Sequence, residues 1–156
     1  QLCDKHITKD DIVVGFSASG TTPFVLSILK HCRKEGIPTG CIVNNPHSPI
    51  AEWADYEVEV ITGPEFVTGS TRMKAGTSQK LILDMISTTL QIRQGRVEGN
   101  KMVNAKLINH KLIDRACRIF MERNSEYKDY EEVRQLILKA GSVKKAEMMI
   151  SRHFDM

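Results

Sequence analysis

The chain has 156 residues, of which 41% are hydrophobic, and its formal net charge is only +3. This is enough apolar material for a domain with a real core, so disorder is not the default. Basic and acidic residues are interspersed, which gives no support to a nucleic-acid-binding surface. No apolar run approaches the ~20 residues that span a bilayer and no signal peptide is recognisable, so we expect a soluble protein without a membrane partner.

The cysteine pattern argues against a metal site. The four cysteines form no CxxC pair and have no histidine nearby at zinc-binding spacing. We expect reduced, mostly buried thiols of a cytoplasmic protein at Cys3, Cys32, Cys41 and Cys117. The chain begins at Gln1 rather than at methionine, which leaves open whether it is a fragment or a complete gene product.

Residues 10–18, DDIVVGFSA, predict a buried parallel strand because the run is short and rich in β-branched residues. The loop that follows has the glycine spacing of the nucleotide-binding motif GxxxxGK[ST], from Gly15 to Gly20. Thr21 stands where that motif has its lysine, which would place a positive charge on the β- and γ-phosphates. The loss of this charge argues against a nucleoside triphosphatase.

Four hydroxyl side chains remain in this loop, at the predicted start of a helix. The unpaired N–H groups and the dipole of a helix N-terminus favour an anion. The loop therefore suits a single phosphate monoester, held by Ser17, Ser19, Thr21 and Thr22. The alternative is that Ser19 or Thr21 only caps the helix, with Pro23 in its first turn. These residues alone leave both interpretations open.

The pattern then alternates between helices and strands. Residues 22–34 have helical spacing, and Gly36 is a candidate for a left-handed C-cap. A second strand is predicted at 37–45, a short helix capped at Ser48 comes next, and a third strand is predicted at 56–62. Because parallel neighbours need crossover connections, this order predicts a parallel sheet whose ligands bind at the carboxyl ends of the strands.

The last part of the sequence is helical. A helix predicted at 77–94 is apolar on more than one side, so we expect its burial in the domain or against a partner subunit in a homodimer. A helix at 104–123 and two short helices around Gly141 follow. We therefore predict an α/β fold, with a parallel-sheet domain at residues 1–100 and a helical C-terminal region at 101–156.

A second polar cluster occupies residues 63–80, GPEFVTGSTRMKAGTSQK. Arg72 and Lys74 could neutralise a phosphate or carboxylate, and Glu65 could hold a sugar hydroxyl or move a proton. Alternatively, Glu65 only pairs with Arg72, while Lys74 and Lys80 form a solvated face. The residues leave open whether the two polar clusters form one site.

Both clusters carry a family resemblance. GFSASGTTPF resembles the SxSGxT phosphate loop of sugar isomerase (SIS) domains, matched by Ser17, Ser19, Gly20 and Thr22. The stretch GPEFVTGSTRMKAGTSQKLILDMIST, residues 63–88, is similar to the signature shared by N-acetylmuramic acid 6-phosphate etherases and the glucokinase regulatory protein. The resemblance runs over most of residues 8–123 and implies a partial SIS fold.

The resemblance implies a specific chemistry. Such etherases cleave the lactyl ether of their amino-sugar phosphate by elimination of D-lactate and addition of water, with carboxylate acid–base catalysis and no metal or other cofactor. The expected products are N-acetylglucosamine 6-phosphate and D-lactate. The substrate-binding residues implied here are Ser17, Ser19, Gly20, Thr21, Thr22, Glu65, Ser70, Thr71, Arg72 and Lys74.

The catalytic glutamates proposed for the family belong to the half that would lie upstream of Gln1. None is carried over, so the catalytic residues stay unassigned and Glu65 is only a weak candidate. We expect the chain to be the carboxyl-terminal portion of an etherase that keeps part of the phosphosugar site and lacks the acid–base pair. The alternatives are a non-catalytic module of the regulatory-protein type and a sugar-phosphate isomerase, against which residues 63–77 argue.

Overall fold

The computed structural model describes residues 6–154, with side chains described up to residue 151. The chain divides into two compact units, residues 1–85 and residues 86–156. The division that the sequence suggests after residue 100 rests on sequence character rather than on compactness, and it stays a prediction.

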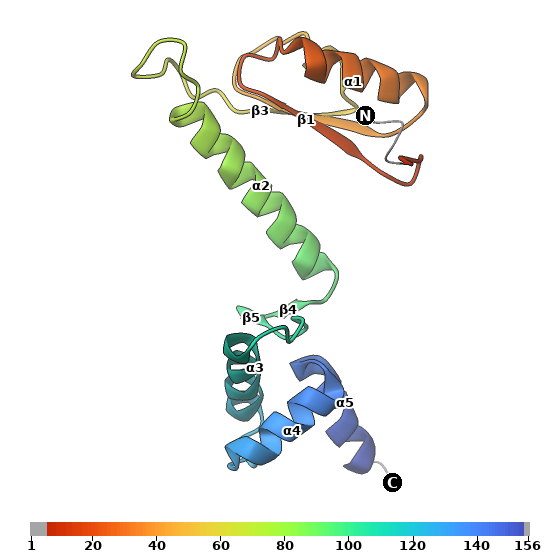
Figure 1. The fold of residues 1–156 in the computed structure, drawn as a ribbon, viewed down its shortest axis with the longest axis vertical. Helices are drawn as coiled ribbons and strands as arrows, with labels where there is room; N and C mark the ends of the chain where they lie inside the picture. The colour runs from red at the N-terminus through yellow and green to blue at the C-terminus, as the bar shows by residue number, and fades with distance from the viewer. Residues whose placement is uncertain (1–5, 155–156) are drawn as a thin grey trace. The chain divides into compact units, whose positions relative to one another are not determined.

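The first unit is built on a parallel sheet of three strands in the order β1-β2-β3 (Figure 1). Its strands are β1 at Val13–Ser17, β2 at Thr39–Val43 and β3 at Tyr56–Glu59. The central strand β2 is buried along its whole length, as expected for a strand with neighbours on both sides and covered faces. The predicted parallel α/β sheet is confirmed, and its parallel strands all end at one edge.

Helix α1, Pro23–Lys34, packs on one face of this sheet (Figure 1). Its inner side buries Leu29 in a core cluster with residues of β2. The helix comes so close to β1 that a Cβ atom built on Gly15 would lie 2.5 Å from a methyl carbon of Val25. The helix ends as predicted, because Gly36 has a φ of +70°, a left-handed conformation that glycine adopts without strain.

The short helix predicted after Ser48 is only the single 3-10 turn η2, Ala51–Trp53, and the predicted cap is wrong. The Ala51 amide donates to the Ser48 carbonyl oxygen at 3.0 Å, whereas the Ser48 side chain caps nothing. The Ser48 side chain is buried against Gly20 and is not turned towards the first amides of a helix.

Helix α2, Lys74–Arg93, begins three residues before its predicted start at 77. Among its described residues only Ala75 is buried. Large apolar side chains along it are 42% to 56% exposed: Leu81, Leu83, Met85, Ile86, Leu90 and Ile92. The described residues therefore do not bury this helix, and its burial against a partner subunit or against strands outside this chain stays a prediction.

The second unit is helical apart from a short hairpin of β4, Val97–Glu98, and β5, Lys101–Met102. The helix predicted at 104–123 begins later, at His110, because the Asn109 side chain accepts a hydrogen bond from the Leu112 amide at 2.9 Å and caps it.

The three helices of this unit share one core, and they are α3 at His110–Arg123, α4 at Tyr130–Ala140 and α5 at Val143–Phe154. The two short helices predicted around Gly141 are confirmed by α4 and α5, and Gly141 has a φ of +81°. Phe120, Val133 and Ile137 are fully buried in this core. The predicted helical C-terminal region is thus confirmed, with its own apolar cluster.

Candidate functional site

The carboxyl ends of the three parallel strands bring together three polar segments of the first unit. The loop at 17–22 follows β1, Asn44 and Asn45 follow β2, and the long loop at 60–73 follows β3. The Asn44 amide donates to the Ala18 carbonyl oxygen at 3.1 Å, and the Asn45 side-chain nitrogen donates to the same oxygen at 2.8 Å. Such an edge is where ligands of open parallel sheets bind.

The hydroxyls predicted to hold phosphate are paired with one another in the first loop. The hydroxyls of Ser17 and Thr22 hydrogen-bond at 2.8 Å, and those of Ser19 and Thr21 at 2.9 Å. The Gly20 amide donates to the Ser17 hydroxyl at 3.0 Å. The loop thus gathers four hydroxyl groups directly before α1.

These hydroxyls do not cap the helix. Thr22 is the residue at the cap position, and within residues 6–154 no side chain accepts a hydrogen bond from the first amides of α1. Pro23 occupies the first turn, as predicted. The interpretation that Ser19 or Thr21 only caps α1 is therefore wrong, and the positive end of the helix dipole faces the hydroxyl loop.

Gly20 shapes the centre of this loop. Its φ is +71°, and a Cβ atom built on it would lie 2.0 Å from the Cβ atom of Ser48. No side chain fits at this position, because the conformation disfavours one and Ser48 occupies the space.

The second polar loop is organised by Glu65. Its carboxylate accepts hydrogen bonds from the backbone amides of Lys74 at 2.9 Å and Ala75 at 3.0 Å, which are the first two residues of α2. These two amide bonds lower the pKa of Glu65. Glu65 is therefore an ionised cap of α2, which differs from the near-neutral carboxyl group that suits a general base.

The two basic residues of this loop bind other groups of the same segment. The Arg72 Nε donates to the Ser70 hydroxyl at 3.0 Å, and the Lys74 amine donates to the Pro64 carbonyl oxygen at 2.8 Å. Both side chains are exposed. Backbone amides, rather than Arg72, are the hydrogen-bond partners that the described residues give Glu65.

All three strand ends line one cavity of about 230 Å³. Its walls are formed by Ala18, Asn44, Asn45, Thr62, Gly63, Pro64, Glu65, Thr68, Gly69, Thr71 and Ala75. Of the predicted site residues, this cavity includes Glu65 and Thr71; the others lie outside its lining, namely Ser17, Ser19, Gly20, Thr21, Thr22, Ser70, Arg72 and Lys74. Pockets for small molecules usually measure about 300–1,000 Å³, so this cavity is smaller than a typical small-molecule pocket.

Asn44 is the residue that sequence reasoning missed. Its buried side chain donates to the Val60 carbonyl oxygen at 2.9 Å and to the Ser78 hydroxyl at 2.8 Å, and it accepts from the Gln79 side chain at 2.9 Å. One amide thereby fixes the ends of β2 and β3 to the first turns of α2. The sequence signal was the polar pair Asn44–Asn45 directly after an apolar strand.

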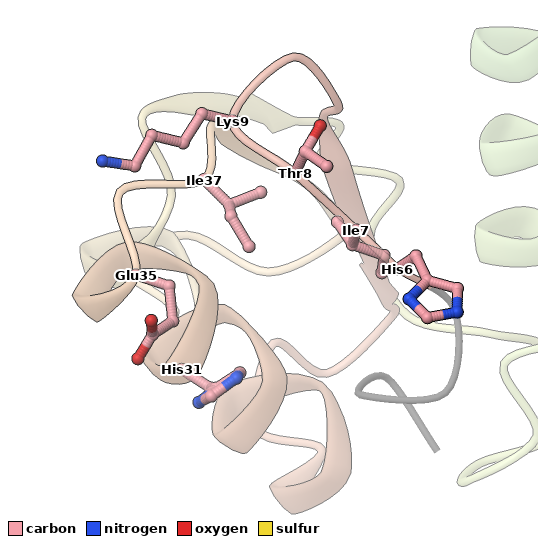
Figure 2. A pocket seen from close by; sticks show the side chains of 7 residues that line it. All are labelled: His6, Ile7, Thr8, Lys9, His31, Glu35 and Ile37. Carbon is pink, nitrogen blue, oxygen red and sulfur yellow. The ribbon is translucent and has the colours of Figure 1, made fainter.

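A larger hollow, of about 560 Å³, lies beside the other end of α1 (Figure 2). Figure 2 shows the polar groups of His6, Lys9 and Glu35 spread around Ile37 rather than converging on one point. The 12 residues of α1 put its two ends about 18 Å apart. We therefore assign the candidate site to the strand edge.

Other kinds of site find little support. Cys32, Cys41 and Cys117 are buried and free, burial raises the pKa of each thiol, and Cys3 lies outside the described residues. Over residues 6–154, no three His, Cys, Asp or Glu side chains gather where they could hold a metal ion. No helix in that range combines the length and apolar character that a bilayer crossing requires.

Comparisons with known proteins show which family and which relatives this chain is similar to. A family model described as SIS domain matches residues 3–88. Proteins named N-acetylmuramic acid 6-phosphate etherase are 54% identical over 153 residues in Bacteroides thetaiotaomicron, 54% over 145 residues in Porphyromonas gingivalis and 50% over 121 residues in Yersinia pestis. These matches cover 98%, 92% and 78% of this chain, and 54%, 52% and 41% of the relatives. The chain spans about half the length of the curated relatives it matches.

Proposed function

The chain belongs to the SIS domain family, and on that premise we propose that it is the phosphate-binding part of an N-acetylmuramic acid 6-phosphate etherase. The whole protein would cleave the lactyl ether of its substrate to give N-acetylglucosamine 6-phosphate and D-lactate. One observation carries this proposal: the chain is 54% identical over nearly its whole length to a relative of that name.

The geometry supports a phosphosugar ligand at the strand edge. Hydroxyls gathered before an uncapped helix suit the three oxygens of a phosphate monoester, because those oxygens accept hydrogen bonds and the helix dipole attracts negative charge. The neighbouring cavity has Ala18 in its lining, and it offers amide, hydroxyl and carboxylate groups to the sugar part of the ligand. We propose that the phosphate lies at residues 17–22 and that Glu65, Ser70, Thr71, Arg72 and Lys74 line or support the same cleft.

The acid–base carboxylates of the reaction are proposed to come from the part of the protein that this chain does not span. Glu65 is the only carboxylate among the described residues that line the cavity, and both its oxygens accept backbone amide bonds that lower its pKa. This observation also favours a second candidate function, a phosphosugar-binding module without turnover.

The two functions are separated by one experiment on the whole gene product. N-acetylmuramic acid 6-phosphate is added, D-lactate is assayed enzymatically, and binding is followed by calorimetry. Released lactate supports the etherase, whereas binding without lactate supports the module. If the intact protein neither binds nor converts this sugar, the proposal fails.

A homodimer and a cytoplasmic location belong to the same proposal. The exposed apolar side chains of α2 support a partner surface, and the free, buried cysteines are typical of a reducing compartment. Sedimentation velocity of the whole gene product tests the assembly, and a monomer at micromolar concentration would count against the dimer.

A further inference from the structure

Ser48 stands out as a buried polar side chain without a partner. It is 2% exposed, and its Oγ is the one buried side-chain polar atom within residues 6–151 that lacks a hydrogen bond. Buried hydroxyls are normally hydrogen-bonded, since losing water without gaining a partner is costly. A side chain of this kind calls for a physical explanation.

The two structural explanations for a serine at this position fail. Ser48 does not cap η2, because the Ala51 amide binds its backbone carbonyl oxygen rather than its side chain. Packing alone does not require it either, because alanine would fill nearly the same space without burying an unpaired hydroxyl.

The location of Ser48 points to the hydroxyl loop. A Cβ atom built on Gly20 would lie 2.6 Å from the Ser48 Oγ, so this hydroxyl lies directly against the central glycine of the loop. The Ile50 amide donates to the Gly20 carbonyl oxygen at 3.1 Å, and this bond holds the turn between β2 and η2, which contains Ser48, against the loop. Gly20 stands two residues before Thr22, at the uncapped start of α1.

A phosphate monoester offers three acceptor oxygens, which leaves room for a donor beyond those of the hydroxyl loop. The hydroxyls of Ser17 and Thr22 bond each other, as do those of Ser19 and Thr21, so one O–H of each pair is used and the other is free to donate to an anion. Ser48 lies directly against Gly20, which stands between Ser19 and Thr21 in the chain. The Ser48 hydroxyl therefore offers a free donor beside this loop, and it would give up no hydrogen bond on donating to a ligand there.

We propose that Ser48 is a further phosphate-binding residue, whose hydroxyl donates a hydrogen bond to a phosphate oxygen of the sugar phosphate at residues 17–22. This inference rests on the proposed function, because it takes the ligand and its position from there. It adds a contact from the turn after β2 to a loop that follows β1.

The test is Ser48→Ala in the full chain, with Ser142→Ala as the matched control. Ser142 is also 2% exposed, but its hydroxyl accepts a hydrogen bond from the Lys145 amide at 3.3 Å, in the other unit. Calorimetry gives the Kd for N-acetylmuramic acid 6-phosphate and for inorganic phosphate, and thermal unfolding gives the midpoint of each variant.

Ser48→Ala is expected to raise both Kd values by about tenfold, which corresponds to about 1.4 kcal/mol, and to leave the unfolding midpoint unchanged or higher. Ser142→Ala is expected to leave both Kd values unchanged and to lower the midpoint, because it removes a satisfied hydrogen bond. If Ser48→Ala does not fold, Ser48→Cys keeps the size of the side chain with a weaker donor, and the same rise in Kd is expected.

Two results overturn the inference. One is an unchanged Kd in Ser48→Ala while the wild type binds; the other is a raised Kd accompanied by a midpoint as low as that of Ser142→Ala, which indicates general damage to the loop. A wild-type protein that binds neither ligand, as the isolated chain and as the whole gene product, overturns the proposed function instead.

Discussion

Two helices begin at the same edge of the sheet, and their first turns are in opposite states. The first amides of α2 are held by the Glu65 carboxylate, which accepts from Lys74 and Ala75. Within the described chain no side chain caps α1, whose N-terminus faces hydroxyls that bond one another. One helix start is already satisfied by a protein anion, whereas the other is available to an anion from solution.

The difference indicates where a ligand's charge belongs. Glu65 marks the place where this fold already holds a negative group at a helix N-terminus, so a second anion at α2 would meet an ionised carboxylate. At α1 the same backbone geometry meets neutral hydroxyls, which can donate to an anion and which leave the dipole uncompensated. The contrast therefore favours α1 for the phosphate and assigns the start of α2 a structural role in the cavity wall.

The largest expected effect is that of Gly20→Ala, which would distort the loop before the uncapped N-terminus of α1, called here the open start. The new Cβ atom would meet Ser48 at 2.0 Å in a left-handed conformation, so we expect a loss of about 3 kcal/mol of stability from steric overlap and backbone strain together. Denaturant unfolding measures it.

Gly36→Ala is the matched control for this substitution. Its φ is +70°, but only the flexible end of Lys9 lies nearby, at 3.5 Å. The loss should therefore be about 1 kcal/mol, from conformation alone. Equal losses in the two variants would mean that Ser48 yields easily and that Gly20 is not sterically required.

The next largest effect is expected from the double variant Ser19→Ala, Thr22→Ala, which removes hydroxyls from the open start. A hydrogen bond to a charged group contributes about 1.5–3 kcal/mol, so binding of N-acetylmuramic acid 6-phosphate should weaken by a few kcal/mol at most. The loss is moderated because each removed hydroxyl already bonds another hydroxyl in the free protein: Thr22 bonds Ser17, and Ser19 bonds Thr21. Calorimetry measures it, with the exposed Ser27→Ala as control; wild-type affinity in the double variant would remove this loop from the site.

A smaller effect, on stability rather than on binding, is expected when the occupied helix start loses its charge in Glu65→Gln. The folded pKa of Glu65 is lowered by its amide bonds, so its charge stabilises the protein above the ordinary glutamate pKa of about 4.3. That contribution is lost as the pH falls through the lowered pKa. The unfolding midpoint of the wild type should therefore exceed that of the variant near neutral pH, and the gap should close in acid; a gap independent of pH between 7 and 3 contradicts the cap.

The contrast between the two helix starts also shows which features of the site could be predicted from the sequence. Local patterns predicted the three strands, the hydroxyl loop before α1 and the left-handed Gly36, since each depends on neighbours along the chain. The cap of α2 was missed because Glu65 reaches amides nine and ten residues away across an irregular loop. Asn44 was missed for the same reason, since its partners Ser78 and Gln79 lie more than 30 residues further along.

The smallest effect is expected from substitutions of the two cations beside the start of α2. These substitutions test whether the cations bind the ligand or only stabilise the loop. Arg72 uses its Nε for Ser70, which leaves other guanidinium donors for a planar, bidentate grip on an anion. Arg72→Ala should therefore weaken binding of the sugar phosphate more than Lys74→Arg, which keeps the charge.

Both side chains are exposed, so solvent and salt screen their attraction for an anion and the expected loss is below about 1 kcal/mol. Screening also supplies the test, because the difference in binding affinity between the wild type and Arg72→Ala should shrink when calorimetry is repeated at high salt. Equal and negligible effects of the two substitutions at low salt would assign both cations to the surface of the loop. The phosphate would then be bound by amides and hydroxyls alone, as the open start of α1 already suggests.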